Sequence, residues 1–195
     1  MPENTVAALG DIASATLSDA MDRFGVLEGI HPLWAGATLA GPAFTVWTRA
    51  GDNKGLHTAF ETIRRGDILV VNGGGDVTRA LIGELVAEKA KALAIGGIVL
   101  DGAARDIVGL EEIGVPVFAR AVTPSGPYKN GPFRVGGPIA VGGVSVAPGD
   151  YIIGDADGVV CVPRAEAEAT VLRARELLEG EKVRLDANRQ LVPRG

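Results

Sequence analysis

Runs of branched aliphatic residues alternate with amphipathic stretches through the middle of the chain. Three such runs, at residues 68–72, 97–100 and 115–118, are bounded by glycine or proline and predict buried strands. Apolar positions recur at helical spacing over residues 78–94, and a shorter helix is expected to end near Ile113. This order of strand, helix, strand, helix, strand predicts βαβ units and a parallel sheet layer.

The helix expected over residues 78–94 has two faces. Its predicted apolar stripe is Ile82, Leu85, Val86, Ala90 and Leu93. Glu84 falls on the opposite, polar face, where a carboxylate usually has no role beyond solvation. Gly83 is unusual, because a glycine inside a helix costs about 1 kcal/mol relative to alanine. Its presence predicts a close approach by backbone or ligand.

The two ends of the chain have other patterns. Two short helices are expected first, over residues 4–9 and 16–24, and a long charged helix is expected last, over residues 164–187. That last helix has a narrow apolar seam, which suits packing against one body or a neighbouring subunit. The seam consists of Val171, Ala174, Leu178 and Leu185.

The remaining segments are rich in short apolar runs. Residues 37–50 predict two strands joined around Gly41-Pro42, and residues 54–64 predict a helix. Glycine and proline then interrupt short apolar runs throughout residues 122–163, which predicts a β-rich second half with a hairpin turn at residues 155–158.

Composition narrows the class of protein. The 195 residues, 47% hydrophobic and 22% charged, suit one soluble globular domain. The net charge of −5 argues against a nucleic-acid partner, and two histidines cannot form a histidine-rich zinc site. The single cysteine, Cys161, is expected to be a small core residue. No apolar run is long enough to span a membrane and no secretory leader opens the chain, so we expect a cytoplasmic protein without membrane contact.

The last five residues are expected not to belong to the folded domain. Residues 191–195, Leu-Val-Pro-Arg-Gly, resemble part of a protease recognition sequence of the kind added for expression. Residues 1–190 are therefore expected to form the single domain.

A glycine-rich loop at Gly73-Gly74-Gly75 follows the first predicted strand. Strand, glycine loop and helix in this order can present backbone N–H groups to an anion. A dinucleotide fingerprint requires a glycine where Thr78 stands, and no Gly-Lys-Ser/Thr sequence of a phosphate-binding loop is present. Nucleotide binding is therefore weakly supported.

The strongest chemical signal is the pair Arg105-Asp106. It follows the predicted strand at residues 97–100, which Asp101-Gly102 is expected to end, and it stands at the start of the next helix. Ligands of α/β proteins commonly bind at the carboxyl ends of such strands. The alternative is a surface ion pair with an acidic side chain at a helix start. The pair alone does not separate these interpretations.

Eight short segments, taken in order and spacing, give the chain a family resemblance. They are residues 16–20, 40–43, 66–71, 74–76, 83–86, 101–106, 144–150 and 154–160. The set resembles the 4-hydroxy-4-methyl-2-oxoglutarate / 4-carboxy-4-hydroxy-2-oxoadipate aldolase family, whose relatives include the regulator of ribonuclease activity A. The resemblance implies an α/β fold of layered β/β/α type, similar to swivelling domains, with a parallel βαβ layer, a β-rich second half and a C-terminal helix.

The same resemblance implies a site. The family has an acidic residue, twenty intervening residues and then Arg-Asp, which Glu84 and Arg105-Asp106 match, although the family acid is usually aspartate. Arg105 would hold a 2-oxo acid, Asp106 a divalent metal, expected to be Mg²⁺ or Mn²⁺, and Glu84 a bound water. The backbone of residues Gly83, Glu84, Leu85 and Val86 would receive the substrate carboxylate.

The implied activity is that of a metal-dependent lyase that acts on small 2-oxo acids through a pyruvate enolate, as an aldolase, an oxaloacetate decarboxylase or both. Many aldolases of the family carry a carboxylate three residues beyond the aspartate, where this chain has Gly109. Decarboxylation is therefore expected to exceed aldol cleavage. The resemblance also implies a homotrimer or a dimer of trimers. The alternative function is a non-catalytic regulator of ribonuclease activity that binds a protein partner.

Overall fold

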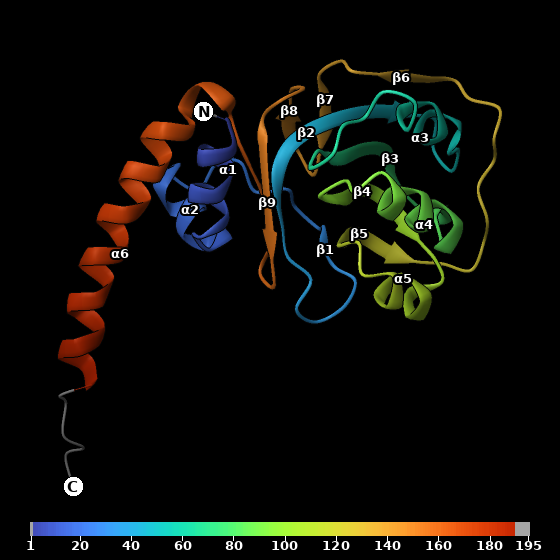
Figure 1. Ribbon diagram of the computed structural model, residues 1–195. Coiled ribbons are helices and arrows are strands. Elements are labelled where there is room, and N and C mark those ends of the chain that lie inside the picture. The colour runs from blue at the N-terminus through green and yellow to red at the C-terminus, as the bar shows by residue number, and fades with distance from the viewer. Residues whose placement is uncertain (1, 190–195) are drawn as a thin grey trace, which may run out of the picture.

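A parallel four-stranded unit forms the centre of the computed structural model, which describes residues 2–189 (Figure 1). The strands β2, β3, β4 and β5 run parallel and adjacent, and antiparallel strands extend the sheet on both sides in the order β1-β5-β4-β3-β2-β9-β10. A further strand, β6, pairs with β2. The bounds are β1 His31–Pro32, β2 Leu39–Thr48, β3 Ile68–Ile82, β4 Gly97–Ala104, β5 Val117–Val122, β6 Phe133–Val135, β9 Tyr151–Asp155 and β10 Gly158–Val162.

Three helices cover one face of the parallel strands (Figure 1). They are α3 (Lys54–Ala59), α4 (Glu84–Ala92) and α5 (Ile107–Ile113). The core beneath them contains fully buried residues of the strands, such as Val71 and Leu100, with Leu56, Ala87 and Leu110 of the helices. The βαβ units predicted from the apolar runs are confirmed.

Two further layers complete the fold. The hairpin of β7 (Ile139–Val141) and β8 (Val144–Val146) covers a second core together with β9 and β10. The helices α1 (Pro2–Gly10), α2 (Ser14–Ala20) and α6 (Ala167–Arg189), the last preceded by the 3₁₀ turn η1 (Arg164–Glu166), enclose a third core against β9 and β10. The α/β class, the β-rich second half and the C-terminal helix agree with the sequence-based expectation.

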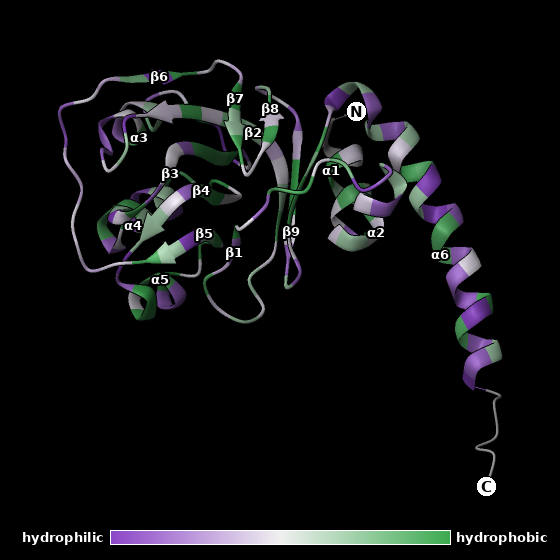
Figure 2. Cartoon of the chain, turned by 180° about the vertical axis from the view of Figure 1, so that it is seen from behind, coloured by the Kyte–Doolittle hydropathy of each residue, from purple (hydrophilic) through white to green (hydrophobic). Residues whose placement is uncertain are grey.

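The long helix α6 leaves the body of the molecule (Figure 2). Its first half is anchored by Val171 and Ala174, which are buried, while Leu178 and Leu185 of the predicted seam are 40% and 53% exposed. Within residues 2–189, no helix is both long and apolar enough to cross a membrane. The tail at residues 191–195 lies outside the described residues.

The predicted helix over residues 78–94 is wrong in its first part. Strand β3 continues to Ile82, and its pairing with β4 shifts register three times between Asn72 and Ile82. Gly74 and Gly75 have φ near +70°, which lets the strand bulge instead of turning into a helix. Leu85 is 87% exposed, so it does not belong to an apolar stripe.

Smaller corrections have similar causes. Asp101-Gly102 does not end the fourth strand, because Gly102 pairs with Asp76 and β4 continues to Ala104. Residues 39–48 form one strand, not two, since its first part pairs with β9 and its second with β3. The helix α3 ends five residues before the predicted limit, and α2 ends before Phe24, which is 76% exposed.

Candidate active site at the strand ends

Arg105 and Asp106 connect the carboxyl end of β4 to α5. Asp106 has the left-handed conformation (φ 60°, ψ 44°), which is uncommon for a residue other than glycine. Its carbonyl accepts the Leu110 N–H at 2.9 Å, so the residue begins the helix. The Nε of Arg105 lies 3.4 Å from Oδ2 of Asp106, and the two side chains are 40% and 39% exposed. The pair is therefore fixed at its backbone and open to solvent at its charged ends.

The segment Gly83-Glu84, at the start of α4, lies directly against this pair. The Glu84 N–H donates to Asp106 Oδ2 at 3.3 Å. Gly83 is extended, and a Cβ added there would overlap Asp106 Oδ2 and come within 3.0 Å of Cγ and Nε of Arg105. A close approach by backbone or ligand was predicted from this glycine; the structure places the side chains of Asp106 and Arg105 there instead, and Gly83 precedes the helix rather than lying inside it.

The backbone N–H groups at this helix start differ in availability. The Val86 N–H donates to the Gly83 carbonyl at 3.1 Å, so it is already used. The N–H groups of Gly83 and Leu85 make no hydrogen bond to any residue that the structure describes. Free N–H groups at the start of a helix favour an anion. Of the four residues whose backbone was expected to receive the substrate carboxylate, Gly83 and Leu85 thus retain open donors, whereas the N–H of Glu84 faces Asp106.

The side chain of Glu84 lies over Gly109 of α5. A Cβ added at Gly109 would overlap Oε1, Cδ and Cγ of Glu84. The longer glutamate therefore fills the room in which a side chain at position 109 would begin. In the family pattern, Glu84 and Gly109 are two separate departures. In the structure they are in contact and form one spatial unit.

Two further features of the site were missed by sequence reasoning. Gly126, in the segment between β5 and β6, is so close to Arg105 that an added Cβ would lie 3.0 Å from its Nη1. Three exposed apolar residues also stand near the pair in sequence or strand register. Leu85 and Val108 lie in the first turns of α4 and α5, Val122 pairs with Ala104, and the three are 87%, 74% and 54% exposed. Neither feature has a local sequence signal, because each depends on how distant segments meet.

The donor set suits a metal that takes few protein ligands. Across the described residues, no group of three histidine, cysteine, aspartate or glutamate side chains could hold a metal ion. Oδ2 of Asp106 faces Glu84 N–H and Arg105, whereas Oδ1 makes no hydrogen bond within the described part of the chain. Mg²⁺ is commonly held by one or two carboxylates and several waters. The exposed Asp106 fits such an ion.

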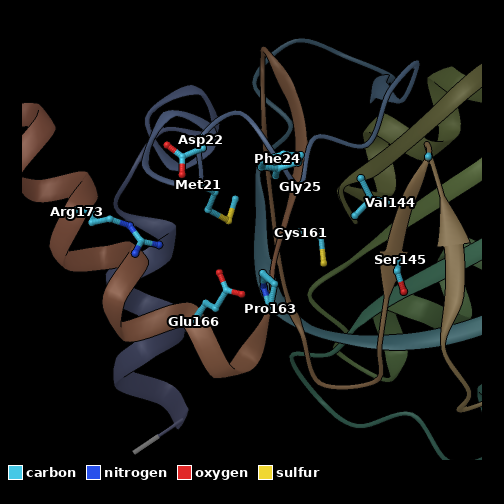
Figure 3. A pocket seen from close by; sticks show the side chains of 11 residues that line it. Met21, Asp22, Phe24, Gly25, Val144, Ser145, Cys161, Pro163, Glu166 and Arg173 are labelled. Carbon is cyan, nitrogen blue, oxygen red and sulfur yellow. The ribbon is translucent and has the colours of Figure 1, made fainter.

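A separate cavity of about 580 Å³ lies between the turn that follows α2, at residues 21–25, and α6, β8 and β10 (Figure 3). Its lining includes Met21, Val144, Arg173 and Cys161, and none of the predicted site residues. Burial, and secondarily the charge of Asp150, raises the pKa of the Cys161 thiol to about 12. Cys161 is 1% exposed and is a core residue, as predicted, so it supplies no thiolate nucleophile.

Comparison with known proteins decides the family. A model of the RraA-like family, described as Aldolase/RraA, matches residues 14–161. The chain belongs to the RraA-like family. One relative from Halalkalibacterium halodurans, named "Putative 4-hydroxy-4-methyl-2-oxoglutarate aldolase", is 37% identical over 174 residues, or 89% of this chain and 83% of the relative.

Solved structures of RraA-like proteins share the fold. RraAS2 of Streptomyces coelicolor, described as an unusual member of the RNase ES inhibitor RraA protein family, has a TM-score of 0.84 at 30% identity and covers 92% of this chain and 94% of its own. An uncharacterized protein from Pseudomonas syringae has a TM-score of 0.89 at 27% identity, with 99% and 92% covered. The family therefore contains proteins named as aldolases and proteins named as ribonuclease inhibitors.

Proposed function

We propose that this protein is a metal-dependent lyase that cleaves 2-oxo acids through the enolate of pyruvate. The observation that carries the proposal is the meeting of three different groups at one junction. These are the guanidinium of Arg105, the unpaired Oδ1 of Asp106 and the open N–H groups of Gly83 and Leu85. The aldolase name of the relative from H. halodurans supports the same reaction class.

The substrate is held by fixed positive groups. In our proposal the N–H groups of Gly83 and Leu85 bind its carboxylate, as helix starts bind anions. Arg105 donates with two parallel N–H groups to two oxygens of the 2-oxo acid, the keto oxygen and one carboxylate oxygen, a geometry that lysine cannot offer. The 40% exposure of the Arg105 side chain leaves these donors accessible.

Bond cleavage moves an electron pair onto the keto oxygen of the substrate. In oxaloacetate the bond to the departing carboxylate breaks, and in a 4-hydroxy-2-oxo acid the C3–C4 bond breaks. Arg105 stabilises the negative charge as it develops, and a proton then returns to C3. Asp106 would hold Mg²⁺ or Mn²⁺, and a bound divalent cation supplies Lewis-acid stabilisation of the same charge. Glu84 would orient water beside it.

The two reactions differ in the need for a base. Aldol cleavage requires removal of the proton on the 4-hydroxyl, and positioned general bases contribute about 10²–10⁴-fold. Glu84 is the carboxylate at hand, and it lies over Gly109, where many aldolases of the family carry a second one. We therefore propose that decarboxylation of oxaloacetate exceeds aldol cleavage. Comparing kcat/KM for oxaloacetate and for 4-hydroxy-4-methyl-2-oxoglutarate tests the ranking, and a preference for the aldol substrate reverses it.

Replacing Arg105 by lysine tests the binding site. Lysine keeps the charge and loses the planar fork, so Arg105→Lys should lower kcat/KM for oxaloacetate by about 10–150-fold, the range expected for a hydrogen bond to a charged group. The exposed Arg23→Lys, whose side chain is 80% exposed beside Asp19, is the matched control and should have no effect. Wild-type kinetics in Arg105→Lys would place the substrate elsewhere.

We further propose that the protein forms a trimer or a dimer of trimers, with the site at a subunit boundary. The exposed apolar residues Leu85, Val108 and Val122 lie beside the site, and Leu178 and Leu185 are exposed on α6. Such apolar surface is typical of protein interfaces. Light scattering at assay concentration checks the proposal, and a fully active monomer would contradict it.

The same apolar surface supports a second function, that of a regulator that binds a ribonuclease. The solved relative RraAS2 is described as belonging to the RNase ES inhibitor RraA family. The two functions make different predictions for Asp106→Asn, which should abolish lyase activity and leave inhibition of a ribonuclease unchanged. A protein that inhibits a ribonuclease and releases no pyruvate from either substrate would favour the regulator.

A further inference from the structure

The segment 123–132, which connects β5 to β6, forms one wall of the candidate site. Gly126 is its point of contact, because an added Cβ would lie 3.0 Å from Nη1 and 3.9 Å from Cζ of Arg105. Where this segment lies therefore sets where the Arg105 guanidinium rests. The segment has no regular secondary structure of its own, so other residues must hold it in place.

The C-terminal half of the segment is held by the buried carboxylate of Asp52. Its Oδ2 accepts the N–H groups of Asn130 and Gly131, both at 2.9 Å. The Tyr128 N–H donates to the Gly51 carbonyl at 2.8 Å, and its carbonyl accepts the Asn53 N–H at 3.0 Å. These bonds fix residues 128–131 but do not reach Gly126.

The half that contacts Arg105 is held by β3. The Ala80 N–H donates to the Ser125 carbonyl at 2.8 Å. Nη1 of the neighbouring Arg79 donates to Ser125 Oγ at 3.2 Å and to the Gly126 carbonyl at 3.3 Å. The Arg79 guanidinium also lies over the Tyr128 ring, 4.3 Å from its centre. One side chain thus ties together three residues of the wall.

Within residues 2–189, Arg79 forms no ion pair that would explain its position. Among the described residues, none of the carboxylates lies within ion-pair distance of it. Its stem lies against Gly51, where an added Cβ would come within 2.8 Å of Cδ. The guanidinium therefore lies along the segment, and no carboxylate in the described part of the chain neutralises its charge. Arg79 donates to the carbonyl of Gly126, and the Arg105 guanidinium lies where a side chain at the same residue would begin.

We propose that Arg79 is a positioning residue for Arg105, acting through Gly126. Arg79 fixes the Gly126 peptide, and Gly126 in turn limits where the Arg105 guanidinium can lie when it receives the 2-oxo acid. This inference rests on the proposed function, since it assigns substrate binding to Arg105. It predicts that Arg79 affects substrate affinity without contacting the substrate.

The test compares Arg79→Gln with Arg49→Gln. Arg49 lies over the same Tyr128 ring at 5.5 Å and binds Asp52 and Asn130, but it does not touch Gly126. Arg79→Gln should raise KM for oxaloacetate about tenfold or more with a smaller change in kcat, because a charge-assisted hydrogen bond is lost. Arg49→Gln should change KM less than about threefold, and Arg79→Lys should recover part of the loss. Equal KM values in the Arg79→Gln and Arg49→Gln variants would overturn the proposal.

A second variant probes the contact itself. In Gly126→Ala the added methyl group meets the far end of a flexible side chain, so the melting temperature should stay near that of the wild type while KM rises. A readout independent of turnover is labelling of Arg105 by phenylglyoxal, followed by peptide mass spectrometry. We expect faster labelling of Arg105 in Arg79→Gln and Gly126→Ala, and unchanged labelling in Arg49→Gln.

The labelling separates the two proposals. Changed labelling in a protein that releases no pyruvate would support the positioning of Arg105 and refute the lyase function. Unchanged labelling of Arg105 in Arg79→Gln would overturn the positioning role, whatever the activity of the wild type.

Discussion

Two aspartates that follow parallel strands of the same sheet, β2 and β4, have opposite surroundings. Asp52, beyond β2, is fully buried and accepts the N–H groups of Lys54, Asn130 and Gly131 at 2.9 Å, as well as Arg49 at 3.2 Å. The Asp106 side chain, beyond β4, is 39% exposed, and among residues 2–189 its nearest donors are 3.3 and 3.4 Å away on Oδ2 alone. The first carboxylate has used its hydrogen-bonding capacity within the protein, and the second has kept part of it.

This contrast separates an anchor from a candidate ligand. A buried carboxylate with all of its partners stabilises the fold and has nothing left to offer a substrate. Asp106 is partly exposed, and its Oδ1 makes no hydrogen bond to a described residue. Its left-handed backbone conformation costs free energy, and no described contact of Oδ1 offsets that cost. We therefore assign Asp52 to the architecture of the site and Asp106 to its chemistry.

The largest expected effect is the loss of activity in Asp106→Asn. Removing the charge of the proposed metal ligand should lower kcat/KM for oxaloacetate by about 10²-fold or more, while the melting temperature changes little because the side chain is exposed. Pyruvate release and calorimetry on the same sample check both parts. Unaltered kinetics would show that the contrast between the two aspartates has no functional meaning.

Asp52→Asn should have its effect on stability instead. The amide keeps the shape but loses the charge that four donors face, so we expect the free energy of unfolding to fall by about 3 kcal/mol. For a chain of this size that corresponds to a melting temperature lower by about 6–12 °C. Denaturant unfolding measures it, and a variant as stable as the wild type would contradict the role of Asp52 as an anchor.

The stability provided by Asp52 should depend on pH. Burial raises the pKa of its carboxyl, but the three backbone donors and Arg49 outweigh burial and lower the pKa below its usual value. The stabilisation is therefore complete above the unfolded pKa of about 4 and is lost as the pH falls through the lower folded pKa. The stability difference between wild type and Asp52→Asn should be constant from about pH 5 to 7 and shrink below about pH 4. A difference that grows with acid would have the wrong sign.

Gly83→Ala tests whether the close packing at Gly83 holds Asp106 and Arg105 in their functional positions. The added methyl group would overlap Asp106 Oδ2 and crowd Arg105, which displaces both functional side chains. We expect kcat/KM to fall by about 10–100-fold, comparable to the loss of a supporting contact at a metal site. Gly137→Ala is the matched control, because its Cβ would meet nothing within 4 Å. Equal activity in both variants would refute the crowding.

The smallest expected effect concerns the exchange of Glu84 and Gly109. Gly109→Glu alone cannot simply add a carboxylate, because Glu84 occupies the room, so it should lower both activities. The double variant Glu84→Asp/Gly109→Glu frees that room and should raise aldol cleavage relative to decarboxylation by less than about tenfold. The ratio of kcat/KM for the two substrates measures this. An improved aldolase from Gly109→Glu alone would show that the two residues are independent.

The sequence predicts the central part of the fold because local patterns and tertiary pairing agree there. The apolar runs at residues 68–72 and 97–100 are buried strands, and Arg105-Asp106 does begin a helix after the second of them. The tripeptide Gly73-Gly74-Gly75 shows where local patterns are insufficient. Glycine permits either a turn or a bulge, and pairing of β3 with β4 selects the bulge.

The candidate site is predictable only in part, for the same reason. The roles of Glu84, Arg105 and Asp106 were expected from family spacing, and the structure brings the three residues together. The contact of Gly126 with Arg105 was not foreseeable, because it depends on the distant Arg79 holding part of an irregular segment. Likewise, the exposure of Leu85 follows from where α4 begins, which is at Glu84 and six residues after the predicted start at residue 78.

The most direct test of the central claim is pyruvate release from oxaloacetate in the presence of Mg²⁺ and, separately, of excess EDTA. Because Mg²⁺ itself promotes this decarboxylation, each rate is corrected with an enzyme-free blank and compared with Asp106→Asn and Asp52→Asn at equal concentrations of folded protein. We predict turnover that requires Mg²⁺, is lost in Asp106→Asn and persists in folded Asp52→Asn. Full turnover in EDTA, or an Asp106→Asn variant as active as the wild type, would contradict the account.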